Sequence, residues 1–237
     1  MPLTFAHPAI VLPFSKPAKR FLSLTGLVIG SMTPDFEYFI RMKLLSHYSH
    51  TWQGLFWFDV PLGIMLVIIY EFWIKDPLIT HLPTGLNRRF SIYGGYRDYY
   101  SLQYLCAIFI SVLLGAASHL AWDGFTHASG FFVQQIPRLK HIIRYHGHRL
   151  HLYTCLQYAS TIAGTLFILA LCYFLPKQPL TRAKQISGFW LQFTLVAMVT
   201  VAIKLATGLQ LHQYGDIAIT LIDGGLLGLI VASVLNQ

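Results

Sequence analysis

Apolar residues gather along the chain into long runs that are separated by short polar segments. Five of these runs approach the roughly 20 residues that a helix needs to cross a bilayer. They lie at residues 52–74, 102–122, 156–175, 187–207 and 217–235. A further apolar run, at residues 22–32, is too short to cross and predicts a half-helix or a re-entrant segment. The pattern therefore predicts an all-α, polytopic membrane helical bundle with five or six transmembrane helices and a short N-terminal or re-entrant segment.

The composition strengthens the membrane prediction. Hydrophobic residues make up 55% of the chain and charged residues only 11%, and the mean hydropathy is +0.55. A water-soluble domain could not bury so much apolar surface. The net charge of +8 comes from bases in the short polar segments, where the positive-inside rule and anionic headgroups account for it. We therefore expect membrane lipids as partners and no nucleic acid, and the oligomeric state stays open.

The distribution of Lys and Arg predicts the orientation in the membrane. Two sets of polar segments alternate between the apolar runs. The first set carries more Lys and Arg than the second. The first set is the N-terminal segment with residues 75–99 and 176–186, and the second is residues 41–51, 127–153 and 208–214. The positive-inside rule places the first set in the cytoplasm. The loop at 127–153 is also rich in His and bases, and we interpret it as facing lipid headgroups.

Three ionisable residues stand at the end of the 102–122 run, in the sequence His119-Leu-Ala-Trp-Asp123-Gly-Phe-Thr-His127. Their spacing of four places all three side chains along one face of a helix. Ionisable side chains at the edge of a bilayer are costly and persist mainly where they pair, coordinate a cation or do chemistry. The motif therefore predicts a metal site in a membrane protein.

Other polar residues reach the same membrane face if consecutive spans alternate in direction. Asp35, His47 and His50 then join the motif, and His7 joins if the N-terminal segment folds back. Two carboxylates near this face, Glu37 and Asp59, could act as general base or as outer-shell partners of a ligand His. Asp35 could instead be a helix cap. Each single His could instead be a residue that makes ordinary hydrogen bonds at a helix end.

The residue types in this set suit a divalent transition metal. Neutral imidazoles and ionised carboxylates are good ligands for Zn²⁺, and Mn²⁺ or Fe²⁺ are alternatives. Cysteine is absent from the set, which argues against a closed structural zinc site. With an open ligand position, a bound cation lowers the pKa of its water toward about 7 and supplies hydroxide as a nucleophile. We expect one or two ions.

Several motifs resemble a bacterial membrane family, the domain-of-unknown-function family 4184, which is related to the membrane-bound metal-dependent hydrolases. The resemblance covers roughly residues 1–170. Its motifs are Thr4-Phe-Ala-His7-Pro-Ala, Gly30-Ser-Met-Thr-Pro-Asp35-Phe, His50-Thr with Gly54, and Ser118-His119 through His127. The resemblance implies an integral protein of the bacterial cytoplasmic membrane. The distribution of Lys and Arg then predicts that the proposed site faces the outer side of this membrane.

The order of ligands is also similar to that of zinc-dependent phospholipase C and the related single-strand nucleases. Carried over residue by residue, this resemblance implies Asp35, His50 and His119 as ligands of one metal and His7 as a ligand of a second. Asp123 would bridge the two ions, and His127 could serve a third. The chain departs from those soluble enzymes because it begins with Met1-Pro2 instead of their metal-binding Trp.

Two functions remain open at this point. The first is a metal-dependent hydrolase with a phospholipase C-like activity, in which a metal-bound hydroxide attacks a phosphoester of a lipid or amphipathic substrate, with Asp35, Asp123 and Glu37 as catalytic carboxylates. The second is a non-catalytic protein, either with a structural metal site or as a small transporter of ions or solutes. No internal repeat is evident, so we expect one integral membrane domain over 1–237, with a metal-site core at about 1–170 and C-terminal helices at about 187–235.

Overall fold

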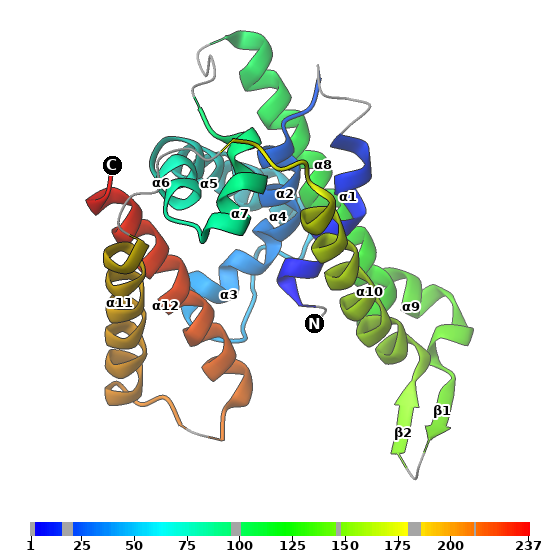
Figure 1. The fold of residues 1–237 in the computed structure, drawn as a ribbon. Helices are drawn as coiled ribbons and strands as arrows, with labels where there is room; N and C mark the ends of the chain where they lie inside the picture. Colours follow the sequence, from blue (N-terminus) through cyan, green and yellow to red (C-terminus); the bar gives the residue numbers. More distant parts are fainter. Residues whose placement is uncertain (1–2, 16–20, 96–100, 146–147, 180–185, 211) are drawn as a thin grey trace. The chain divides into compact units, whose positions relative to one another are not determined.

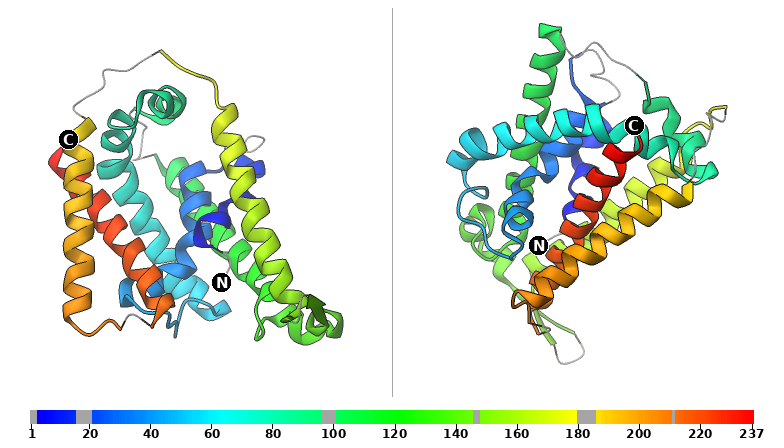
Figure 2. Two further views of the ribbon diagram at one scale, coloured as in Figure 1. Left: turned by 60° about the horizontal axis from the view of Figure 1, so that its bottom comes forward. Right: turned by 90° about the vertical axis from the view of Figure 1, so that its left-hand side faces the viewer.

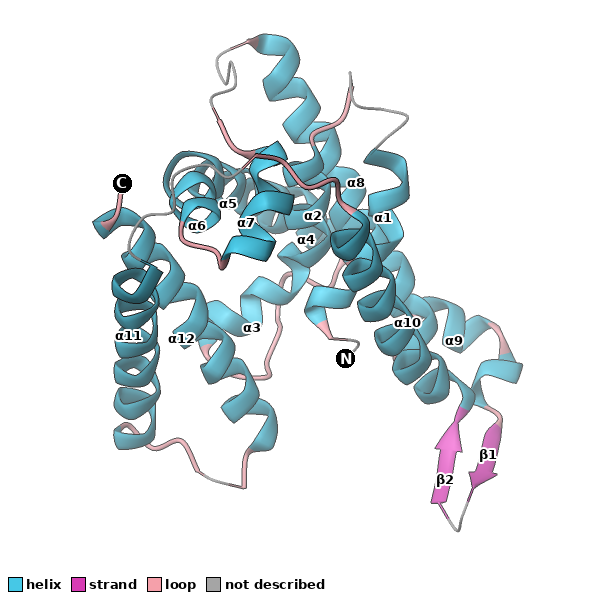
Figure 3. Cartoon of the chain, viewed as in Figure 1, coloured by secondary structure: helices cyan, strands magenta, loops and turns pink. Residues whose placement is uncertain are grey.

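A computed structural model describes residues 3–15, 21–95, 101–145, 148–179, 186–210 and 212–237. The described chain is almost entirely helical, and a single small hairpin supplies its strands (Figures 1 and 3). Five helical stretches within it are long and apolar enough to cross a membrane. They are Trp52–Thr80, Leu102–Gln135, Leu152–Phe174, Ile186–Ala206 and Tyr214–Leu235. The prediction of an all-α polytopic bundle is confirmed, with five candidate spans.

The chain divides into two compact units, each built from separate stretches of sequence. The first unit comprises Met1–Asp35, Tyr48–Ile64 and Tyr99–Tyr173, and the second comprises Phe36–His47, Met65–Asp98 and Phe174–Gln237. The predicted single domain over 1–237 stays a prediction. The N-terminal bases Lys16, Lys19 and Arg20 lie outside the described residues.

Short N-terminal elements surround one long helix in the first unit. They are a 3₁₀ turn at Thr4–Ala6, α1 (Pro8–Ser15), α2 (Leu24–Met32) and a second 3₁₀ turn at Thr33–Asp35. The long helix is α8 (Leu102–Thr126), which packs against α2. Gly115 allows this close contact, because a Cβ there would lie 2.6 Å from the carbonyl oxygen of Leu27. The predicted half-helix at 22–32 is confirmed as α2.

Hydroxyl side chains fix where the helices of this unit begin. The Ser23 side chain caps α2 by accepting a hydrogen bond from the Gly26 amide, and Ser101 caps α8 in the same way through Tyr104. The Ser23 amide also donates to the Ser111 hydroxyl on α8, at 2.8 Å in a buried position. The start of α2 is thereby tied to α8 as well as to its own first turn.

The remaining elements of the first unit come before and after α8 in the sequence. Before it come α4 (Trp52–Gly54), a π-helical turn at Leu55–Asp59 and the start of α5 (Val60–Ile69). After it come α9 (Phe131–Gln135), a 3₁₀ turn at Pro137–Lys140, the antiparallel strands β1 (Ile142–Tyr145) and β2 (His148–His151), and α10 (Leu152–Phe174). The expected loop at 127–153 is therefore partly helical and partly a hairpin, because the pairing of β1 with β2 satisfies backbone polar groups.

The second unit contains two long antiparallel helices, α11 (Ile186–Ala206) and α12 (Tyr214–Leu235), which run side by side (Figures 1 and 2). Its other elements are α3 (Phe36–Arg41), the end of α5, a π-helical turn at Tyr70–Ile74, α6 (Lys75–Thr80), α7 (Thr84–Phe90) and a 3₁₀ turn at Ser91–Tyr93. The expected polar loop at 75–99 is thus helical over much of its described length, since the span that begins at Trp52 continues to Thr80.

Candidate metal centre

Five of the predicted ligand residues meet inside the first unit, although they come from four separate segments. His7 precedes α1, Asp35 ends the 3₁₀ turn after α2, and His50 precedes α4. His119 and Asp123 lie one turn apart near the end of α8. Among the described residues, two groups of three side chains could hold a metal ion, one formed by His7, His119 and Asp123 and the other by Asp35, His50 and His119. The convergence predicted from alternating spans therefore occurs for Asp35, His50, His119 and Asp123, and His7 joins them because the N-terminal segment folds back.

The site is buried in the unit. His119 is fully buried, and His7, Asp35 and Asp123 expose 3%, 1% and 8% of their surface. The His7 and His119 rings are stacked, with centroids 3.7 Å apart. Burial at this level means that unsatisfied polar atoms are costly, so the partners of each nitrogen and oxygen decide what the site is for.

The Asp123 carboxylate faces a different pair of imidazoles with each oxygen. Its Oδ2 lies 3.4 Å from Nε2 of His119 and 3.6 Å from Nε2 of His50. Its Oδ1 lies 3.7 Å from Nε2 of His7 and 3.5 Å from Nδ1 of His127. Each oxygen of Asp123 therefore lies near at least one imidazole of the ligand groups, so that this carboxylate could help to hold one or two ions.

Asp35 completes the donor set on the Oδ2 side of Asp123. Its Oδ1 lies 3.4 Å from Nε2 of His50 and 3.7 Å from Nε2 of His119. Two ligand atoms held by one tetrahedral Zn²⁺, at about 2.0–2.2 Å each, lie about 3.4 Å apart. The observed separations match that value and exceed the usual length of a hydrogen bond.

Several of these atoms have no hydrogen-bond partner. Both ring nitrogens of His7, Oδ1 of Asp35, Nε2 of His119 and Oδ1 of Asp123 are buried and unpaired. Native proteins rarely leave such atoms unsatisfied, and the binding of an ion is one of the standard explanations for them. The donor set, its spacing and its unpaired atoms all fit a divalent metal.

Neighbouring groups orient the ligands. The Ser31 carbonyl accepts a hydrogen bond from Nδ1 of His119 at 2.8 Å, which leaves Nε2 to point into the cluster. Thr4 donates its hydroxyl to Oδ2 of Asp35 at 2.5 Å, which leaves Oδ1 facing the imidazoles. The Ser49 hydroxyl lies 3.0 Å from Nδ1 of His50. Outer-shell partners of this kind fix the tautomer and the direction of metal ligands.

The protonation states of the ligands outside the spans suit metal binding. Burial, with a further contribution from His119, lowers the pKa of His7 to about 3, so its imidazole is neutral at neutral pH. Burial alone would raise the pKa of Asp35, but His119, His50 and Thr4 outweigh that effect and lower it. Neutral imidazole and ionised carboxylate are the forms that bind a cation.

The comparison with protein families supports the motif analysis. Residues 1–234 match the model of a family described as a domain of unknown function, DUF4184. The chain belongs to the DUF4184 family. The predicted resemblance to this family is confirmed, and the match extends beyond residue 170 almost to the end of the chain. The predicted relationship to metal-dependent hydrolases and the phospholipase C-like order of ligands stay predictions. No curated protein and no solved structure matches this DUF4184 protein.

Other residues of the DUF4184 protein that were predicted for the site have different surroundings. His127 lies outside both ligand groups, and its Nδ1 is 3.2 Å from the carbonyl oxygen of Asp123, as expected of a residue that ends α8. Asp59 is fully buried in the π-helical turn Leu55–Asp59 and belongs to neither group. His127 as a ligand of a third cation stays a prediction.

Glu37 and His47 belong to the second unit. The Glu37 carboxylate accepts hydrogen bonds from Arg41 at 2.8 Å, from the Ser46 hydroxyl at 3.0 Å and from the His47 amide at 2.9 Å. It therefore holds the end of α3 and the loop that follows, while His47 itself is exposed. A catalytic role for Glu37 stays a prediction.

The orienting residues Thr4, Ser31 and Ser49 were not predicted from the sequence. Thr4 stands three residues before His7 in the same motif, but its partner Asp35 lies in another segment. Ser31 acts through its backbone carbonyl, which carries no side-chain signal. Such contacts depend on the packing of α2 against α8 and have no periodicity in sequence.

Proposed function

We propose that this DUF4184 protein is a membrane-embedded, metal-dependent hydrolase that cleaves a phosphoester or similar bond of a lipid or amphipathic substrate. The observation that carries the proposal is the meeting of three imidazoles and two carboxylates in two overlapping groups at ligand spacing, with buried atoms of His7, Asp35, His119 and Asp123 that lack a hydrogen-bond partner. Zinc is the metal we expect, since the set combines nitrogen and oxygen ligands, and manganese or iron are alternatives.

The protein groups have distinct tasks in this proposal. His7, His50, His119 and Asp123 would hold the ion or ions. A divalent ion there would activate a water molecule and stabilise negative charge that develops on the phosphoryl oxygens. In hydrolysis the water oxygen forms a bond to phosphorus while the bond from phosphorus to the leaving oxygen breaks. Asp35 or Asp123 accepts the proton of the water, and the leaving oxygen then takes up a proton.

A different architecture would be expected of a structural metal site. Structural zinc sites are closed by four protein ligands, commonly with Cys, whereas catalytic sites combine His with a carboxylate and leave a position open. The described cysteines, Cys106, Cys155 and Cys172, are free, and none belongs to either ligand group. The donor set therefore favours the catalytic class.

The proposal also gives the protein a location. We place it in the bacterial cytoplasmic membrane with the metal centre toward the outer face. The five apolar spans support membrane insertion, and the higher content of Lys and Arg in the segments at 75–99 and 176–186 supports this orientation.

Hydrolysis assays on the purified full-length protein test the proposal. We would present phospholipid vesicles with added Zn²⁺ or Mn²⁺ and detect released headgroup phosphates and the remaining lipid by mass spectrometry. His119→Ala should abolish turnover while the protein stays folded and extractable in detergent. His212→Ala, which changes an exposed His in the second unit, is the matched control and should retain full activity.

The opposite outcome favours the non-catalytic alternative. If the parent protein hydrolyses no phosphoester with any added metal, or if His119→Ala abolishes folding as well as turnover, the cluster is a structural site or part of an ion pathway. Equal turnover of His119→Ala and the parent would exclude the cluster from catalysis.

A further inference from the structure

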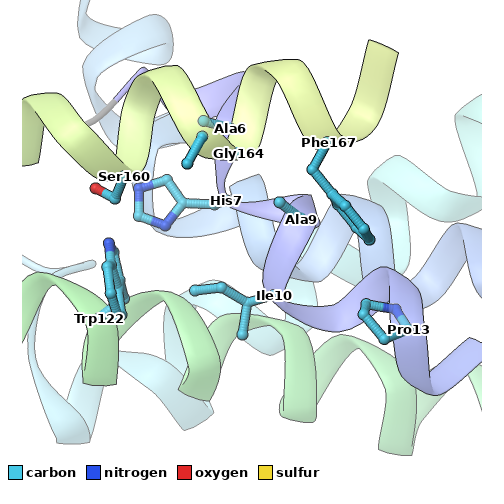
Figure 4. Close-up of a pocket in the computed structure, with 10 residues that line it drawn as sticks. Ala6, His7, Ala9, Ile10, Pro13, Trp122, Ser160, Gly164 and Phe167 are labelled. Atoms are coloured by element: carbon cyan, nitrogen blue, oxygen red, sulfur yellow. The ribbon is translucent and has the colours of Figure 1, made fainter. Parts of the chain in front are cut away.

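A cavity of about 420 Å³ opens beside His7 in the first unit, between α1, α8 and α10 (Figure 4). This volume lies within the roughly 300–1,000 Å³ of pockets that hold small ligands. The character of its walls changes from one end to the other. Figure 4 shows His7, Trp122 and Ser160 together at one end and Pro13 and Phe167 at the other. The cavity therefore has one end with polar groups and one that is wholly apolar.

His7 belongs both to this cavity and to the candidate metal centre. Its ring lines the cavity and stacks on His119, and its Nε2 lies 3.7 Å from Asp123. It is 97% buried, and neither of its ring nitrogens has a hydrogen-bond partner. The His7 ring therefore forms the boundary between this end of the cavity and the site where we propose that the phosphoester is cleaved.

The apolar end lies within the part of the unit that crosses the membrane. The cavity residues Ala163, Gly164 and Phe167 occupy the middle of α10, which is one of the candidate spans. Neighbouring side chains of α10 such as Ile162 and Leu166 are about 60% exposed, as expected of a helix surrounded by lipid. A hydrocarbon chain can enter such a cavity from the bilayer without passing through water.

The contact between α10 and the N-terminal segment keeps the cavity walls together. A Cβ at Gly164 would lie 3.0 Å from the carbonyl oxygen of Ala6, so the two backbones approach closely there. The Leu3 amide also donates to the Thr161 hydroxyl at 3.3 Å. The segment that supplies His7 is therefore attached to the helix that forms the apolar wall.

We infer that this cavity binds one hydrocarbon chain of the substrate lipid and thereby positions the phosphoester at the His7 end, next to the metal centre. The inference rests on the proposed hydrolase function and names its substrate class, a phosphoester that carries a long alkyl or acyl chain. The lipid enters sideways from the bilayer between the spans.

The test uses water-soluble phosphodiesters with alkyl chains of increasing length, all kept below their aggregation concentration. For the parent protein, KM should fall about fourfold for each added methylene, as expected for transfer of that group from water to an apolar cavity. The fall should stop when the cavity is full, and kcat should change little. Ala163→Trp fills the cavity, so its KM should not depend on chain length, while its metal content equals that of the parent.

A matched variant distinguishes the effect of filling the cavity from the effect of a Trp elsewhere on the surface of α10. Ala170→Trp makes the same change on α10 at another exposed alanine, one that does not line the cavity, and should behave as the parent. A parent KM that is independent of chain length would overturn the inference. So would an Ala163→Trp protein whose chain-length dependence equals that of Ala170→Trp.

A second measurement makes the inference independent of turnover. A phospholipid with a photoreactive group near the end of its acyl chain, incorporated into lipid nanodiscs, should label Ile10 or Phe167 in the parent and in Ala170→Trp but not in Ala163→Trp. Absence of such labelling would overturn the inference even if hydrolysis is observed. Labelling without hydrolysis of any substrate would contradict the proposed function. It would also contradict the assignment of the bound hydrocarbon chain to a substrate, and would show that the cavity binds lipid for another purpose.

Discussion

The two units of this protein bury ionisable side chains in different ways. In the second unit, Nζ of Lys75 lies 2.6 Å from Oε2 of Glu71, one helical turn earlier, and also donates to the carbonyl oxygen of Gly95. These two side chains expose only 3% and 2% of their surface. In the first unit, imidazole nitrogens and carboxylate oxygens are separated by 3.4–3.7 Å around one point. The first arrangement is a closed ion pair and the second is an open set of donors.

The difference shows how burial can be used to separate structural charges from functional ones. A buried charge pair at hydrogen-bond distance satisfies itself, and removing one partner leaves an uncompensated charge. Buried atoms that converge at ligand spacing without partners are not satisfied by the protein alone. We therefore assign Glu71 and Lys75 to the stability of the second unit, whereas the His/Asp cluster could bind a cation.

The largest expected effect comes from breaking the closed pair. Glu71→Ala leaves the Lys75 ammonium buried without its carboxylate and should destabilise the protein by about 3–5 kcal/mol. Thermal unfolding of the purified protein in detergent, with and without Zn²⁺, measures this loss. The double variant Glu71→Leu, Lys75→Met removes both charges and should recover most of the stability. A double variant as unstable as Glu71→Ala would contradict this account of the pair.

A smaller effect should follow from altering the support of the open cluster. Thr4→Val keeps the volume but removes the hydrogen bond to Oδ2 of Asp35, and outer-shell changes of this kind lower metal affinity about 10- to 100-fold. Zinc titration against a competing chelator measures the affinity. Thr220→Val removes a buried hydroxyl that bonds to a backbone carbonyl of the second unit, and its zinc affinity should equal that of the parent. Equal affinities of Thr4→Val and Thr220→Val would show that Thr4 does not position a ligand.

The last expected effect, small for each single pH unit, is a pH dependence of the metal-free protein. His7 has a pKa of about 3 in the folded protein and about 6.5 in the unfolded chain, so between these values the unfolded chain binds the additional proton. The stabilisation is present above about pH 6.5 and is lost as the pH falls toward 3, at up to about 1.4 kcal/mol per pH unit. Thermal unfolding in chelator at several pH values measures the slope.

A non-titrating substitution isolates the contribution of His7. His7→Asn should give a shallower loss of stability between about pH 6.5 and pH 4 than the parent, whereas His212→Ala should not change the slope. The lowered pKa of Asp35 acts in the same direction at still lower pH. An identical slope in His7→Asn and the parent would contradict a buried neutral His7.

The sequence was sufficient to predict the membrane spans and most of the cluster. The spacing of His119 and Asp123 on one helix face is a local property, and it appears in α8 as expected. The approach of Asp35 and His50 followed from the alternating direction of the spans. His7 joined on the condition that the N-terminal segment folds back, and it does so in the first unit.

Contacts between distant segments could not be predicted in the same way. The bond from Thr4 to Asp35, the cavity between α1, α8 and α10, and the β1–β2 hairpin all depend on tertiary packing. The Glu71–Lys75 pair has the i, i+4 spacing of a helical ion pair. The sequence does not reveal this pair, because the polar residues after Ile74 indicate a loop there, whereas the helix continues to Thr80.

Elemental analysis of the detergent-purified protein tests the central claim most directly. The parent and the double variant Glu71→Leu, Lys75→Met should both contain one or two equivalents of zinc, manganese or iron, and Asp123→Ala should contain none. Absence of bound metal from the parent, even after each cation has been added back, would contradict the assignment of the His/Asp cluster as a metal centre.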